Sequence, residues 1–172
     1  MAIQIRKASR NDSSLLCSLI QQAFQDVARQ FNLTRENCPT HPSFYSQERI
    51  QTDLAKGLEF FIIEISSKPV GCVGLEFKNK ELGYLIRLAV LNEYRKKGLG
   101  KMLVIHCFDY ARSRGLARIE IGIISAQKEL RTWYEKLGFE FLQETHFKHL
   151  PFAVTFMVNH LVQSPKIATP GL

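Results

Sequence analysis

The 172-residue sequence predicts a single domain of the α/β (α+β) class, with a mixed and mostly antiparallel sheet of about seven strands and about four flanking helices. Two observations lead to this prediction. Apolar residues recur at helical spacing near the start of the chain and at strand spacing from residue 58 onwards. A strand, a helix and another strand then follow between residues 82 and 125, which predicts a central parallel pair joined by a right-handed crossover.

The first half of the chain changes from helical to strand periodicity. Its opening stretch, "AIQIRKAS", alternates as a strand does, and Asn11 and Asp12 are suitable N-caps for the helix that follows. A second helix ends at Gly57, and three apolar segments separated by short turns predict an antiparallel meander. The strands are expected at residues 2–8, 58–66, 70–78 and 82–91, and the helices at residues 13–31 and 44–56.

The second half contains the crossover helix and a final hairpin. Gly98 and Gly100 open the helix, Gly115 ends it, and Gly138 closes a later, shorter helix. The last strand is apolar on both faces, which predicts a position inside the sheet. Helices are expected at residues 99–114 and 127–137, and strands at residues 117–125, 139–147 and 152–161. Residues 1–162 form the predicted domain, and residues 163–172 are predicted to be a loosely ordered tail.

The composition excludes several classes of protein. Hydrophobic residues make up 45% and charged residues 23%, as in soluble globular proteins. The net charge of +7 permits an anionic partner, but no nucleic-acid recognition motif accompanies it, so we expect no nucleic acid. The chain has no membrane-length apolar run and no apolar signal-peptide region near its start, so we expect a cytoplasmic location and no membrane contact. The four widely spaced cysteines predict neither disulfides nor a bound metal.

The stretch "NEYRKKGLGKML", residues 92–103, stands between a predicted strand and a predicted helix. The first amides of a helix have no internal acceptors, and the helix dipole adds partial positive charge there. Glycines let a ligand approach this backbone, and the cations at residues 95–97 add full charges, so the stretch predicts a site for phosphate oxygens. Met102 and Leu103 stand where a Walker loop needs Ser or Thr and a dinucleotide fingerprint needs Gly, which excludes both motifs.

The longer stretch "RLAVLNEYRKKGLGKML" resembles the acyl-CoA-binding signature of the GNAT superfamily of N-acyltransferases. The core of that signature, Arg/Gln-x-x-Gly-x-Gly/Ala, is met by Arg95, Gly98 and Gly100. Downstream, "LRTWYEKLGFE" is similar to the second signature, in which a Tyr precedes Lys-Leu-Gly-Phe, and the element order agrees from residue 2 to about 162. The resemblance implies the GNAT fold and an acyltransferase that moves an acetyl group from acetyl-CoA, its cosubstrate, to a primary amine by direct attack, with no metal.

The same resemblance implies where the cofactor binds. Acyl-CoA lies between the diverging fourth and fifth strands of such proteins, with its pyrophosphate on the glycine turn and its pantetheine arm along the fourth strand. Gln127 stands where many relatives have an Asn that bonds the pantetheine, and Tyr134 stands where the family has a Tyr that protonates the CoA thiolate. The implied cofactor-binding residues are Leu88, Ala89, Val90, Arg95, Lys96, Lys97, Gly98, Leu99, Gly100, Lys101, Gln127 and Tyr134.

The general base stays open. Many relatives have a Glu in the fourth strand at the position of Tyr84, so Tyr84 itself and the nearby Glu81 are candidates. Glu76, a histidine or a water chain are alternatives.

The acceptor, a small-molecule or peptide amine, is expected beside residues 33–44 and 146–152, where His, Pro and Phe combine. His41, Phe44 and His149 are the candidate contacts. A non-catalytic acyl-CoA-binding regulatory module is the alternative function, because Tyr84 replaces the usual Glu. The resemblance also allows a homodimer formed through the final hairpin.

Overall fold

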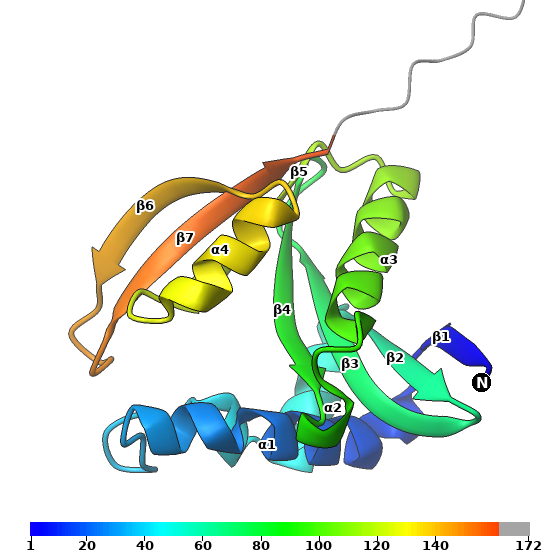
Figure 1. The fold of residues 1–172 in the computed structure, drawn as a ribbon, viewed down its shortest axis with the longest axis horizontal. Helices are drawn as coiled ribbons and strands as arrows, with labels where there is room; N and C mark the ends of the chain where they lie inside the picture. The colour runs from blue at the N-terminus through cyan, green and yellow to red at the C-terminus, as the bar shows by residue number, and fades with distance from the viewer. Residues whose placement is uncertain (162–172) are drawn as a thin grey trace, which may run out of the picture.

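The computed structural model describes residues 1–161, and it confirms the predicted fold class (Figure 1). Within these residues, seven strands form one sheet, and four α-helices flank it. The strands are β1 (Ile3–Lys7), β2 (Glu59–Ile65), β3 (Lys68–Phe77), β4 (Leu82–Val90), β5 (Arg118–Ile124), β6 (Glu140–His146) and β7 (Ala153–His160). The helices are α1 (Ser13–Gln30), α2 (Gln47–Ala55), α3 (Leu99–Ser113) and α4 (Lys128–Lys136). The tail predicted at residues 163–172 lies outside the described residues.

The strands lie in the order β1-β2-β3-β4-β5-β7-β6. Strands β2, β3 and β4 form the predicted meander, and β4 pairs with β5 in parallel, as the crossover requires. Strand β7 lies between β5 and β6, which confirms the interior position predicted from its two apolar faces. Strand β6 therefore forms one edge of the sheet, and pairing of this edge with a second copy stays a prediction.

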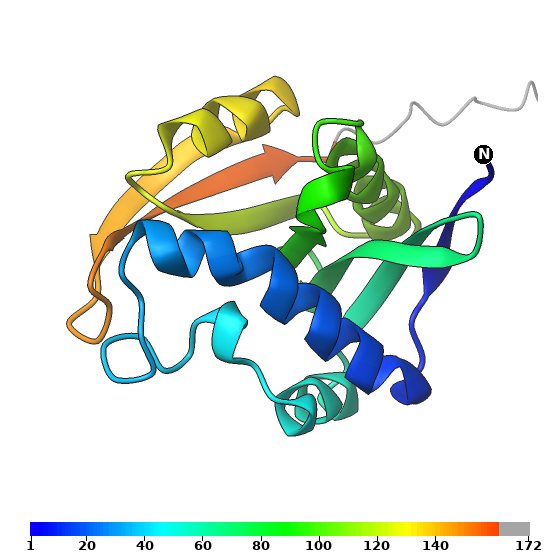
Figure 2. The ribbon, with the colours of Figure 1, turned by 60° about the horizontal axis from the view of Figure 1, so that its bottom comes forward.

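The helices form two layers, with α1 and α2 on one face of the sheet and α3 and α4 on the other (Figure 2). Under α1 and α2, the fully buried Ile20 and Ile50 pack against the apolar residues of β2. Under α3, the fully buried Leu103 and Cys107 pack against β3, β4 and β5. The central part of the sheet is thus covered on both faces, whereas the edge strand β6 is mostly exposed. A ligand can therefore reach the centre of the sheet where two strands separate.

The second helix begins at Gln47, three residues later than predicted. Pro42 opens a short 3₁₀ turn, η2 (Pro42–Phe44), and the Ser46 hydroxyl accepts the N–H of Arg49 at 3.2 Å, as an N-cap does. This earlier turn carries His41 against the protein interior, where the side chain is only 6% exposed.

Residues 1–161 contain neither a membrane-spanning helix nor a cluster of metal ligands. None of the described helices combines the length and apolar composition needed to cross a bilayer. Within the same residues, no three His, Cys, Asp or Glu side chains gather as a metal site would require. All four cysteines are free and buried.

Candidate active site

The parallel pair at the centre of the sheet is very short. Strands β4 and β5 are in register only from Leu82 to Tyr84, opposite Arg118 to Glu120, and then diverge. A cavity of about 800 Å³ opens where they separate, lined by both strands and by residues of α1, α3, α4 and β7. The inner edge of β4 therefore offers unpaired backbone groups to a ligand.

A bulge near the end of β4 shapes this edge. Gly74 of β3 faces Ile86, but Cys72 faces Ala89, so Arg87 and Leu88 together oppose a single residue. Arg87 has a left-handed φ of 53°. The N–H of Leu91 donates to β3 at 2.9 Å, and because backbone groups alternate along a strand, those of Leu88 and Val90 face the cavity.

The glycine turn exposes a row of amides. Lys96 and Gly98 have left-handed φ values of 59° and 81°, and α3 begins directly after Gly98 with no side-chain cap. Met102 donates its N–H to the Gly98 carbonyl at 3.0 Å, but within residues 1–161 the N–H groups from Lys96 to Lys101 have no backbone acceptor. This arrangement of successive free amides at a helix start is a nest that binds anions.

The three cations at residues 95–97, all predicted to add charge to the site, have different surroundings in the structure. The Nε of Arg95 donates to the Val90 carbonyl at 2.9 Å, and its Nη1 lies 3.4 Å from Asp26 of α1, so Arg95 fastens the turn. Lys97 lies over the Tyr94 ring, 5.3 Å from its centroid, and does not line the cavity. Arg95, Lys96 and Lys101 line it, and since Arg95 is paired with Asp26, the two lysines are the cations available to a phosphate.

Tyr134 lies on α4 and also lines the cavity. The centroid of its ring lies 4.9 Å from that of Trp133 and 5.3 Å from that of Phe139, and Tyr134 is only 5% exposed. Burial, and to a smaller degree the Cys107 thiol, raises the pKa of Tyr134 above its usual value, so the phenol keeps its proton. Gln127 directly precedes α4 and lines the same cavity.

Of the three acceptor contacts predicted, the structure brings only His41 to the cavity. Phe44 lines a separate shallow hollow with Leu33, and His149 is exposed beside Phe147. These two positions were predicted from local composition, which does not show how the two loops turn.

His41 does not have the properties of a base. Burial, together with the nearby charge of Arg87, lowers the pKa of His41 to about 4, so the ring is neutral at pH 7. Its Nδ1 accepts the backbone N–H of Ser43 at 3.3 Å and lies 2.8 Å from the Ser43 hydroxyl. Because the backbone group can only donate, we assign Nδ1 as the acceptor of both Ser43 groups and the ring hydrogen to Nε2. His41 can donate a hydrogen bond but has no free lone pair with which to accept a proton.

The carboxylates predicted as bases lie away from the cavity. Glu81 is exposed, 3.7 Å from Arg118, and Glu76 lies 3.4 Å from Lys78. Tyr84 lines the cavity, and its neighbour across the parallel pair is Glu120 of β5. Among the described residues, Glu120 is the one carboxylate that lines the cavity.

Sequence reasoning missed Glu120, although a signal was present. It interrupts the apolar strand "RIEIGII", between Ile119 and Ile121. Both isoleucines belong to the core under α3. Since side chains alternate along a strand, Glu120 points to the opposite face, toward α1.

The cavity therefore has two sides. Tyr134 and the glycine turn lie on the α3–α4 face of the sheet, whereas Glu120 lies on the α1 face with His41. A ligand group held between the diverging strands β4 and β5 can therefore be reached from both faces of the sheet.

The comparisons with known proteins identify the family. The sequence model of the acetyltransferase (GNAT) family matches residues 20–139, and the chain belongs to this family, as the two signatures predicted. An uncharacterized N-acetyltransferase of Methanocaldococcus jannaschii is 29% identical over 87 residues, covering 47% of this chain and 38% of the relative. The probable N-acetyltransferase family 8 member 5 of Mus musculus is 28% identical over 134 residues, covering 70% of this chain and 59% of the relative. This chain thus spans less than two thirds of these two relatives, whereas it spans 81% of the uncharacterized N-acetyltransferase YjgM of Escherichia coli, at 26% identity over 79% of this chain.

Solved structures share the fold at low sequence identity. The PaiA N-acetyltransferase of Thermoplasma acidophilum, in complex with coenzyme A, has a TM-score of 0.78 at 19% identity, covering 93% of this chain and 99% of that one. The ribosomal-protein-S18-alanine N-acetyltransferase of Escherichia coli has a TM-score of 0.76 at 15% identity, covering 98% and 99%. The putative acetyltransferase YncA of Salmonella typhimurium, with acetyl-CoA, has a TM-score of 0.70 at 18% identity, covering 99% of both chains.

Proposed function

We propose that this protein is an N-acetyltransferase that transfers an acetyl group from acetyl-CoA to a primary amine by direct attack. The observation that carries the proposal is the glycine turn, whose unpaired amides stand at the mouth of the split between β4 and β5. The family supports it, and so do the coenzyme A and acetyl-CoA bound by the similar folds of PaiA and YncA.

In this proposal the cofactor binds largely through backbone groups. The amides from Lys96 to Lys101 hold the pyrophosphate, with added charge from those two lysines. The pantetheine arm lies along Leu88 and Val90 like an added strand, and an N–H of this edge polarises the thioester carbonyl. Gln127 offers a side-chain amide to the same arm.

The acceptor amine then approaches the thioester from the α1 face. Glu120 takes a proton from the ammonium ion, directly or through water, which frees the lone pair for attack. Attack of the nitrogen on the thioester carbon forms the C–N bond and gives a tetrahedral intermediate. The C–S bond breaks when this intermediate collapses. The Tyr134 hydroxyl gives its proton to the departing sulfur. The nitrogen loses its second proton as the amide forms, and this proton, passed through water, restores the Tyr134 hydroxyl, so the one proton released overall is the one that Glu120 took first.

The raised pKa of Tyr134 is compatible with this role. Burial weakens the phenol as an acid, but it also strengthens a thiolate as a base, because both anions lose hydration. Cys107, in the same core, shows the second effect, since burial raises the pKa of this thiol to about 12. A thiolate held beside Tyr134 is therefore able to take its proton.

A non-catalytic acyl-CoA-binding module was the alternative, motivated by Tyr84 at the usual Glu position. Glu120, next to Tyr84 across the parallel pair, removes that motive because it supplies a carboxylate to the same part of the cavity.

Two measurements test the proposal together. Isothermal titration calorimetry with coenzyme A tests the turn, and thiol release from acetyl-CoA with a panel of amines tests catalysis. We expect heat on CoA addition and amine-dependent thiol release. Binding without release on any amine would replace the enzyme by the regulatory module, and no binding would remove both.

A further inference from the structure

The bulge of β4 places a cation on the acceptor side of the cavity, at Arg87. We propose, on the basis of the acetyltransferase function above, that Arg87 binds a carboxylate of the acceptor, and that the acceptor is an amino acid with an apolar body.

The Arg87 side chain is held in one orientation. Its Nε donates to the Tyr45 hydroxyl at 2.6 Å, and its guanidinium stacks 4.8 Å from the centroid of the Tyr45 ring. Tyr45 is itself only 4% exposed, and its carbonyl accepts from Cys17 and Gln21 of α1. With Nε engaged, the guanidinium edge that carries Nη1 and Nη2 remains for a ligand, and this edge matches the two oxygens of a carboxylate.

Arg87 has no carboxylate partner within residues 1–161. The other cations of the cavity differ from it, since Arg95 pairs with Asp26, and Lys96 and Lys101 stand at the glycine turn. A half-buried guanidinium beside apolar walls gains from an anion that replaces its lost hydration. A ligand that enters from the α1 face is in a position to supply that anion.

His41 adds a second donor near this cation. Its Nδ1 is occupied by Ser43, so the neutral ring offers only Nε2–H. Glu120 lines the same cavity from β5 and is suited to an ammonium group. The acceptor side thus presents two kinds of group. Arg87 and His41 can donate hydrogen bonds to a carboxylate, and Glu120 can bind an ammonium group, so the two ends of a zwitterion both find a partner.

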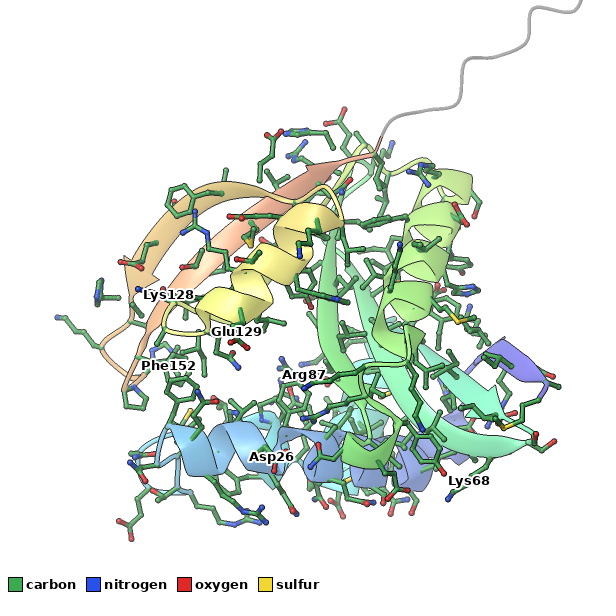
Figure 3. The ribbon with its side chains drawn as sticks, viewed as in Figure 1. Asp26, Lys68, Arg87, Lys128, Glu129 and Phe152 are labelled. Carbon is green, nitrogen blue, oxygen red and sulfur yellow. The ribbon has the colours of Figure 1, made fainter. Side chains whose placement is uncertain are left out.

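The rest of this side is apolar and specifies the body of the acceptor. Figure 3 shows Arg87 where β4 approaches α1, and Phe152 farther along α1, beside the turn between β6 and β7. The apolar lining residues on this side are Phe24, Val27, Phe152, Val154 and Phe156. Rings and branched side chains of this kind favour an aliphatic or aromatic substituent.

Matched acceptors separate the carboxylate from the rest of the molecule. We expect phenylalanine and leucine to have kcat/KM values ten to a hundred times those of phenylalaninamide, phenethylamine and isoamylamine. A second pair, 6-aminohexanoate against hexylamine, tells whether the carboxylate is recognised next to the amine or at a distance. In the variant Arg87→Gln the preference should fall to within about twofold, mainly through KM. Tyr45→Phe, which keeps the cation but frees it, should lose part of the preference.

A binding measurement keeps this inference separate from catalysis. With coenzyme A bound, N-acetylphenylalanine should bind at least tenfold more tightly than N-acetylphenethylamine, and Arg87→Gln should abolish the difference. Equal binding, or faster acetylation of the uncharged amines, would overturn the carboxylate site and leave the acetyltransferase proposal intact. Preferential binding of the carboxylate product without turnover on any amine would support the site and refute the enzyme.

Discussion

The two sides of the split between β4 and β5 recognise their ligands in different ways. On the α3–α4 side the groups are mostly backbone amides, supplied by one continuous stretch that includes Lys96, Gly98 and Lys101. On the α1 side they are side chains from separate parts of the chain, such as His41, Arg87 and Glu120. The first side fits a diphosphate and an extended arm, and the second fits a specific small molecule.

This difference separates binding of the cofactor from choice and activation of the acceptor. Backbone amides keep their position when a side chain is replaced, so substitutions on the α1 side should change turnover and leave CoA binding intact. Changes in the turn should have the opposite effect. Variants of Glu120 and Gly98, one on each side, test whether the two sides are independent.

The largest effect is expected for Glu120→Gln on the α1 side. The variant keeps the shape of the side chain but loses the base, so kcat/KM should fall about 100- to 1000-fold. Calorimetry should show unchanged affinity for coenzyme A. Glu81→Gln, outside the cavity, is the matched control and should stay within about twofold of the parent. Equal losses in the two variants would exclude Glu120 as the base.

The next largest effect is expected for Tyr134→Phe, which removes a single oxygen from the cavity wall. Thiol release should slow about 10- to 100-fold because the departing thiolate loses its proton donor, while CoA affinity stays the same. Tyr110→Phe is the control, since that hydroxyl binds Arg114 at 2.9 Å and Tyr110 does not line the cavity. Steady-state kinetics in which Tyr134→Phe matches the parent would assign the ring to packing alone.

A smaller effect, of the opposite kind, is expected for Gly98→Ala in the turn. Gly98 and Gly115 share a φ of 81°, and an added Cβ meets no atom within 4 Å at either position. Alanine should therefore cost about 1 kcal/mol of stability in both variants. Only Gly98→Ala should weaken CoA binding, by about tenfold, because the strained turn displaces its amides. Calorimetry that finds the same CoA affinity in both variants would disconnect the turn from the phosphate.

The difference between the two sides also explains why the sequence predicted the cofactor side better than the acceptor side. The fold and the cofactor side follow from periodicity and from residues close together in the chain, such as Gly98 and Gly100. The acceptor side depends on the β4 bulge, which turns Arg87 toward Tyr45, and on the alternation that turns Glu120 toward α1. The bulge depends on pairing between strands, which no local pattern in the sequence shows.

The smallest effect concerns His41 and the pH dependence of stability. Its pKa is about 4 in the folded protein against 6.5 for an ordinary His, so between these values the unfolded chain binds the extra proton. Stability from this group is complete above pH 6.5 and decreases as the pH falls toward 4, with a slope of at most about 1.4 kcal/mol per pH unit. In His41→Asn, which can still accept the Ser43 N–H, urea unfolding should depend less on pH across this range. His149→Asn, at an exposed position, should keep the slope of the parent. An unchanged slope in His41→Asn would mean that His41 is protonated in the folded protein, and the neutral donor assigned to the acceptor side would be wrong.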